Sequence, residues 1–214
     1  MASAPDKLAS LRHLLAERFP TVPRTTGRVL PTGIPGIDDA TGGLPLSAVT
    51  EVVCAAPSCG GHLLIGQLLA ATRATRIRVA LIDSADSFDP TSFDEDLLTH
   101  LVWVRCASTS AALGVADLLV RDANLGLVVL DLRRALESDL RRTPSTQWYR
   151  LQRAVEPTDL AFLVETPCAS VPSAQVRFQL TASLTADAFE RERTLIAAEL
   201  TPTLQRQRVQ AATG

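Results

Sequence analysis

The sequence predicts an α/β fold in which a mostly parallel sheet is flanked by helices, with antiparallel strands at the C-terminal edge. Two observations support this fold class. From residue 49 onward, short apolar runs alternate with longer stretches of helical periodicity. The apolar runs are nearly continuous, with little polar alternation, which is typical of parallel strands that helices bury on both faces.

Residues 6–19 are the first predicted element, an amphipathic helix. Pro20 and Pro23 end it, and residues 20–31 are expected to be an extended connector. A lone amphipathic helix has no core of its own, so its stripe packs either on the main domain or on another chain. We therefore treat residues 1–30 as a helix with its linker. The apolar stripe consists of Leu8, Leu11, Leu14, Leu15 and Phe19.

Five apolar runs are predicted core strands, at residues 49–54, 77–83, 101–106, 125–131 and 160–165. Helical periodicity lies between them at about residues 61–73, 108–122 and 145–156. Residues 175–184 and 193–200 predict an antiparallel pair at the sheet edge, although 193–200 also fits a helix together with 187–192. The core domain is therefore expected over residues 31–200, and the polar, Gln-rich residues 201–214 predict a frayed, flexible tail.

The composition narrows the classes of function. The chain has 214 residues, 21 basic and 23 acidic, which excludes a wholly basic nucleic-acid-binding body but not a local basic patch. No apolar run reaches membrane-spanning length and no signal peptide is recognisable, so we expect a cytoplasmic protein without membrane contact. The cysteines form no CxxC pair and predict reduced, mostly buried thiols: Cys54, Cys59, Cys106 and Cys168.

A loop of small residues follows the first core strand. Residues 54–62 read CAAPSCGGH and lead directly into a helix, the layout of a phosphate-binding loop. A working loop follows GxxxxGK[ST], whose lysine contacts the β- and γ-phosphates. With Ala55 in the first glycine position, Gly61 and His62 replace the lysine and the hydroxyl residue; with Cys54 there, Gly60 replaces the lysine. Both registers lack the lysine.

Two of these loop residues have alternative interpretations. His62 lies at the start of the following helix, where the helix dipole disfavours an imidazolium, so we interpret it as a turn residue. Cys54 and Cys59 have four residues between them. We favour two small buried side chains, with a metal or redox pair as the alternative.

Beyond the loop, residues 32–45 (TGIPGIDDATGGLP) resemble the opening of RecA-like and KaiC-like ATPase cores. Residues 81–90 (LIDSADSFDP) resemble the RecA segment that carries the catalytic glutamate, with Ala85 at the glutamate position. The strand ending at Asp131 resembles the Walker B strand, with Asp131 at the Mg²⁺-side aspartate. The resemblance covers roughly residues 30–200 and implies that the domain at residues 31–200 is a RecA-like core.

The resemblance also shows what the chain lacks. The loop lysine, the loop Ser/Thr and the catalytic glutamate are each missing where the family places them. Because phosphoryl transfer depends on positioned charge around the phosphates, we expect no ATP hydrolysis, no cofactor and no metal site. A residual ATPase, with Asp131 binding Mg²⁺ and Asp86 orienting water, is the alternative.

Short bacterial RecA-like proteins that lack these groups include the ImuA-like and SulA-like families, and the chain resembles the ImuA-like family more. That resemblance implies a non-catalytic accessory protein of SOS-induced mutagenesis and translesion synthesis, nucleoid-associated when active. The implied partners are an ImuB-like Y-family-related protein and a C-family error-prone polymerase. Contact with RecA and homo-oligomer formation are further options, and a SulA-like inhibitor of cell division is the runner-up.

Residues 133–150 contain candidates for weak binding of single-stranded DNA. Arginines contact phosphates, and the Trp148–Tyr149 pair offers rings that stack on bases. Glu137 and Asp139 interrupt the arginines, however, which favours an ordinary solvated helix or loop. For the two rings, we favour one in the core and one at its rim. The candidate DNA contacts are Arg133, Arg134, Arg141, Arg142, Trp148 and Arg150.

Overall fold

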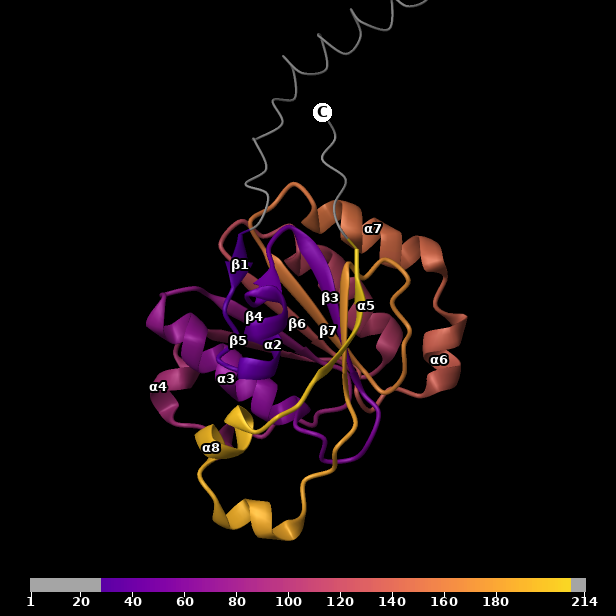
Figure 1. The fold of residues 1–214 in the computed structure, drawn as a ribbon. Coiled ribbons are helices and arrows are strands. Elements are labelled where there is room, and N and C mark those ends of the chain that lie inside the picture. The colour runs from indigo at the N-terminus through magenta and orange to yellow at the C-terminus, as the bar shows by residue number, and fades with distance from the viewer. Residues whose placement is uncertain (1–27, 209–214) are drawn as a thin grey trace, which may run out of the picture.

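The computed structural model describes residues 28–208, which form a seven-stranded sheet with helices on both faces (Figure 1). The strand order is β5-β4-β6-β7-β3-β8-β9, and every neighbouring pair is parallel except β8 and β9. This confirms the predicted fold class. The strands are β3 (Ala48–Cys54), β4 (Val79–Asp83), β5 (Leu101–Arg105), β6 (Leu127–Asp131), β7 (Ala161–Thr166), β8 (Val176–Leu180) and β9 (Thr203–Gln207).

Burial along the strands follows their place in the sheet. Every residue of β3, β4, β6 and β7 is buried, as expected for central strands with helices on both faces. In β8, next to the edge, buried and half-buried residues alternate, and the edge strand β5 is partly exposed.

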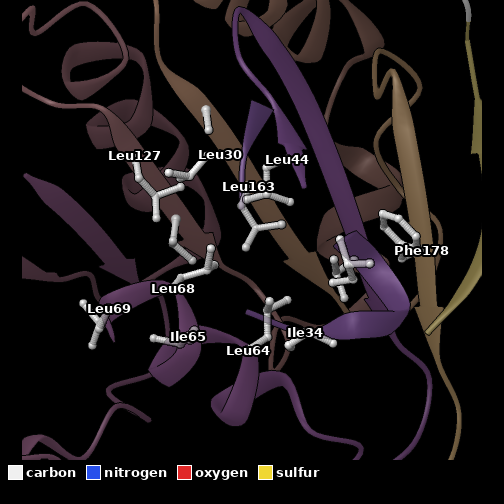
Figure 2. Packing of buried hydrophobic residues seen from close by; sticks show 14 of the residues in the cluster. Leu30, Ile34, Leu44, Leu64, Ile65, Leu68, Leu69, Leu127, Leu163 and Phe178 are labelled. Atoms are coloured by element: carbon white, nitrogen blue, oxygen red, sulfur yellow. The ribbon is translucent and has the colours of Figure 1, made fainter. Parts of the chain in front are cut away.

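Two hydrophobic cores fill the space between the sheet and its helices. The helices on one face are α2 (Pro35–Thr41), α3 (Gly61–Ala74) and α4 (Glu95–Leu98); those on the other are α5 (Thr109–Leu119), α6 (Glu137–Arg142) and α7 (Ser145–Val155) (Figure 1). In the first core, Leu64 and Leu68 of α3 pack near Leu163 of β7 (Figure 2). The second core holds Trp148 of α7, which is 1% exposed.

A small hairpin unit precedes the large sheet. The antiparallel strands β1 (Val29–Leu30) and β2 (Leu44–Pro45) enclose α2. Asp38 closes the turn before that helix, because its Oδ1 accepts from both the backbone N (2.9 Å) and Oγ1 (2.8 Å) of Thr32. Gly42 ends the helix in a left-handed conformation, φ 75°, that favours glycine. The end of α2 thus accounts for the glycine at position 42.

The C-terminal segment differs from the prediction. Residues 193–200 contain the helix α8 (Arg193–Ala198), so the strand interpretation is wrong and the helical alternative is correct in kind. The antiparallel partner of β8 is β9, inside the stretch predicted to be a frayed tail. An edge strand is held by backbone hydrogen bonds on one side, and its exposed side chains can be polar. For that reason β9 carries no apolar signal.

Two further predictions concern the ends of the chain and the membrane. The predicted helix at residues 6–19, with its apolar stripe, lies outside the described residues. Over residues 28–208, no helix is long and apolar enough to cross a membrane.

Candidate functional site

A cleft of about 810 Å³ lies at the carboxyl ends of β3, β6 and β7. The small-residue loop forms one wall, the segments after β4 and β6 contribute others, and the segment around α8 closes it. In parallel α/β sheets ligands bind beyond the carboxyl ends of the strands. The predicted loop therefore lies where such a fold places its binding site.

The loop turns sharply and is held by the C-terminal segment. Ser58 has a φ of 53° and Gly60, the residue before α3, has a φ of 100°. The Leu184 N–H donates to the Ser58 carbonyl at 2.9 Å, and a Cβ on Gly60 would lie 2.5 Å from Leu200 Cδ2. Only glycine fits at that position. The first residues of α3, Gly61 to Leu63, line the cleft, and the first amides of a helix have no acceptor within it.

The Arg133 side chain lies against Gly61 and supplies a cation that the loop itself lacks. A Cβ on Gly61 would lie 2.7 Å from Arg133 Cδ and 2.8 Å from its Nη1. Gly61 stands at the lysine position when Ala55 is taken as the first glycine. The positive charge beside the loop therefore comes from the end of β6 instead of from α3. No pattern in the sequence indicated this approach.

Two buried carboxylates hold this guanidinium. Arg133 Nε lies 2.9 Å from Asp131 Oδ1 and Nη2 lies 2.5 Å from Oδ2. Arg133 Nε is also 3.0 Å from Oε2 of Glu165, a residue of β7 with no exposed surface. Within residues 28–208, neither Glu165 oxygen accepts a hydrogen bond with good geometry. Asp131 is thus committed to Arg133, while Glu165 is only partly compensated.

The charges of the cluster shift one another's titration. Burial raises the pKa of Glu165 to about 8, although attraction to Arg133 opposes the shift. Burial lowers the pKa of the Arg133 guanidinium, but Glu165 and Asp131 raise it more, so the net shift is upward. Burial and the neighbouring Arg133 lower the pKa of His62, whose Nε2 lies 3.4 Å from Arg133 Nη2. These directions describe a cationic Arg133 beside a neutral His62.

The segment after β4 lines the cleft with Ser87 and Asp89, whereas the predicted positions were Ala85 and Asp86. Ala85 donates its backbone N–H to Asp83 Oδ1 at 3.1 Å, and it does not line the cleft. Asp86 is exposed and pairs with Arg105 at 3.6 Å. Ser87 does line the cleft, and its Oγ lies 3.4 Å from Asp131 Oδ2. The position resembling the catalytic glutamate thus carries no carboxylate into the site.

The candidate DNA-binding residues do not gather on one surface. Trp148 is in the core and Tyr149 is 41% exposed, which confirms the interpretation of one ring inside and one at the rim. Trp148 is buried and cannot stack on a base, so its predicted DNA contact is wrong. Arg133 lines the cleft and is engaged with carboxylates, and its contact with DNA stays a prediction.

The other four candidate arginines differ in their surroundings. Arg134 is exposed and lines the cleft. Arg141 and Arg142 pair with acidic residues of their own helix, and Arg150 pairs with Asp117 at 3.2 Å. Residues 137–142 form the short, mostly solvated helix that the interleaved charges favoured.

The cleft is therefore lined by the first residues of α3 and by arginines, and Asp131 beside it is already paired with Arg133. No protein-family model and no curated protein matches this chain. In the part of the chain that the structure describes, no group of three or more His, Cys, Asp or Glu side chains is arranged to bind a metal ion. The chemistry of the cleft is consequently inferred from its own geometry.

Proposed function

We propose that this chain is a non-catalytic RecA-like accessory protein of DNA-damage-induced mutagenesis that acts by docking to partner proteins. The observation that carries the non-catalytic part is the placement of Arg133 beside Gly61, in contact with Asp131 and Glu165. The docking part is supported by the resemblance to the ImuA-like family. That resemblance points to an ImuB-like protein, a C-family polymerase and further copies of the chain as partners.

The charge arrangement argues against hydrolysis. In a working loop, a lysine on the helix is free to contact phosphate, and nearby carboxylates remain free for Mg²⁺ and for the attacking water. Here Asp131 holds the cation beside the loop through both contacts of a bidentate ion pair, and the same guanidinium also contacts Glu165. Ala85 has only a methyl group, which cannot position water. The cation for the phosphates and the carboxylate for Mg²⁺ are therefore occupied, and the group that would position water is missing.

An ATPase measurement tests this part of the proposal. We expect the full chain with ATP and Mg²⁺ to release phosphate no faster than the buffer, with or without single-stranded DNA. Hydrolysis that Asp131→Ala abolishes, but Asp122→Ala at an exposed residue outside the cleft does not, would overturn the proposal and favour the residual ATPase.

Docking is tested with the predicted helix of residues 6–19. We expect the full chain to co-purify with the ImuB-like protein of the same genome. The double substitution Leu11→Asp and Leu15→Asp should abolish this, because it places charge on the apolar stripe. Ser10→Asp adds one negative charge on the opposite side of the predicted helix and should leave binding unchanged. Equal binding by all three proteins would contradict docking through the stripe.

Self-association is a separate prediction of the same proposal. Deleting residues 1–20 should leave a folded protein that is more monomeric, since the stripe is the expected contact between copies. Light scattering measures the molar mass, from which the number of copies per particle follows. An unchanged number of copies would contradict self-association through this helix.

A further inference from the structure

The two edge strands of the seven-stranded sheet differ in how far they are protected from pairing with another chain. β9 has the polar, mostly exposed sequence TLQRQ, and its pairing with β8 contains a register shift. Irregular pairing and charged side chains are common protections of an edge strand. β5, at the opposite edge (Figure 1), has the sequence LVWVR and pairs with β4 in an unbroken register. Val102 on this strand is 48% exposed, so β5 is the less protected edge.

Alternate backbone groups of β5 face away from the sheet. The His100 carbonyl accepts from the Val79 N–H at 3.1 Å, so this end of the strand faces β4 through residue 100. At the other end, the Cys106 N–H donates to the Asp83 carbonyl at 2.8 Å. Because these groups alternate in direction along a strand, the odd-numbered residues in between face outward. Within residues 28–208, no backbone hydrogen bond involves the N–H or C=O of Leu101, Trp103 or Arg105.

An exposed apolar surface adjoins this edge on one face of the sheet. Val102 lies beside Ala80 of β4, whose side chain belongs to the core that α5 covers, so Val102 points to the α5 face. Val104, two residues further on, points the same way. The helix α5 packs against β4 and β6, and its outward side is largely apolar. The exposed residues on that side include Ala111, Gly114 and Leu118.

We propose that β5 pairs antiparallel with β5 of a second copy of this chain, about a two-fold axis at Trp103. This axis places residue 101 opposite residue 105 of the second copy, and residue 102 opposite residue 104. The outward-facing residues of the two strands then lie opposite one another, and each N–H meets a carbonyl group. Because Trp103 is the middle residue of β5, an axis at this position pairs the full length of the strand with itself.

Charge and side-chain matching favour a second copy over other occupants of this edge. Val102 faces Val104 across the axis, on the side where α5 adds apolar surface. The single charged residue of β5, Arg105, lies opposite Leu101, so no like charges meet. Arg105 already lies 3.6 Å from Asp86, so β5 has no unpaired charge that would attract a nucleic acid or an acidic segment. The pairing goes beyond the proposed function and does not depend on the predicted N-terminal helix.

Light scattering on the full chain tests the pairing. Val102→Asp places a carboxylate opposite Val104 of the second copy and should halve the number of copies per particle. Leu204→Asp is the matched control, because it adds the same charge at a leucine of the other edge strand that is 37% exposed. This control should leave the number of copies unchanged. Equal behaviour of the two variants, or a natural chain that is monomeric at high micromolar concentration, would overturn the proposal.

The double substitution Leu11→Asp and Leu15→Asp separates this contact from self-association through the N-terminal stripe. We expect the full chain with both substitutions still to pair through β5, and the further change Val102→Asp to make it monomeric. If the double variant is already monomeric, the stripe accounts for all self-association and the β5 pairing is wrong. If the double variant has as many copies as the natural chain, only the contact through the stripe is contradicted.

Disulfide cross-linking tests the register, in a background of Cys106→Ser and Cys168→Ser that removes the two partly buried thiols. Residues 102 and 104 of the two copies form a pair without backbone hydrogen bonds, in which the Cα atoms lie about 4.5 Å apart. A disulfide spans such a distance. Val102→Cys and Val104→Cys should therefore cross-link when the two variants are co-expressed and oxidised, and neither should cross-link alone. Cross-linking of either variant alone, or none in the mixture, contradicts the two-fold axis at Trp103 and with it the proposal.

Discussion

Two buried carboxylate–arginine clusters in this molecule differ in how completely they are satisfied. Glu51 on β3 and Glu165 on β7 both have no exposed surface, and each contacts an arginine that is mostly buried. Both carboxylate oxygens of Glu51 accept hydrogen bonds. Its Oε1 accepts from Thr166 Oγ1 at 2.9 Å, Ser170 N at 2.7 Å and Val171 N at 3.1 Å, and its Oε2 accepts from Arg177 Nε at 2.5 Å.

Glu165 has a poorer environment. It shares one guanidinium with Asp131, its oxygens accept no hydrogen bond with good geometry within residues 28–208, and its pKa rises to about 8 because of burial. A buried carboxylate with full hydrogen bonding links several segments of the chain, whereas a buried carboxylate that shares its only partner is incompletely compensated. The Glu165 cluster borders the cleft. Sites of function are where such local costs are expected in a fold that is otherwise consistent.

The largest effect is expected from breaking the satisfied cluster. Glu51→Ala leaves the mostly buried Arg177 without its partner and two backbone amides without an acceptor. The free energy of unfolding should fall by about 3–5 kcal/mol, measured by urea denaturation. Glu137→Ala removes an exposed ion pair with Arg141 and should change little. Equal losses of unfolding free energy in the two variants would show that the Glu51 cluster stabilises the fold no more than an exposed ion pair does.

The Glu165 cluster should show itself in the pH dependence. The folded pKa of Glu165 is about 8, above its ordinary value of 4.5, so between these values the native state holds a proton that the unfolded state has released. The contribution of this group to stability is therefore fully present below about pH 4.5, and it is lost as the pH rises from there through about 8. The glutamine of Glu165→Gln cannot titrate. As the pH rises from 6 to 8, the free energy of unfolding of this variant should therefore rise by about 2 kcal/mol relative to that of the natural sequence.

Urea denaturation at several pH values measures this difference. Glu137→Gln, an exposed carboxylate on α6, serves as the control and should follow the profile of the natural sequence. Parallel profiles for Glu165→Gln and the natural sequence would mean that the pKa of Glu165 is not raised on folding.

The smallest effect should come from crowding the arginine beside the loop. Gly61→Ala places a methyl group 2.7 Å from Arg133 Cδ, so the side chain must shift and its ion pairs weaken. We expect a loss of about 1–2 kcal/mol in thermal or urea unfolding. Gly114→Ala, within α5, meets nothing within 4 Å and should stabilise the protein by about 0.5–1 kcal/mol. If Gly61→Ala is also stabilising, Arg133 is not held in place by its carboxylates.

Predictability from the sequence varied with the kind of signal. The central strands were predicted to within about two residues because both of their faces are buried, and they therefore read as apolar runs. The edge strand β9 was missed because its residues are mostly exposed and polar. The loop after β3 was recognised because small residues between a strand and a helix are a local pattern.

The sequence by itself determined the layered α/β fold, the position of the loop and the absence of its lysine, since these depend on local composition and periodicity. Only the tertiary structure decided that Arg133 lies beside Gly61 and that Glu165 shares it with Asp131. The physical reason is that parallel strands bring their carboxyl ends together from distant parts of the chain. Charge compensation at that edge depends on strand order and side-chain packing, and no local pattern in the sequence encodes either.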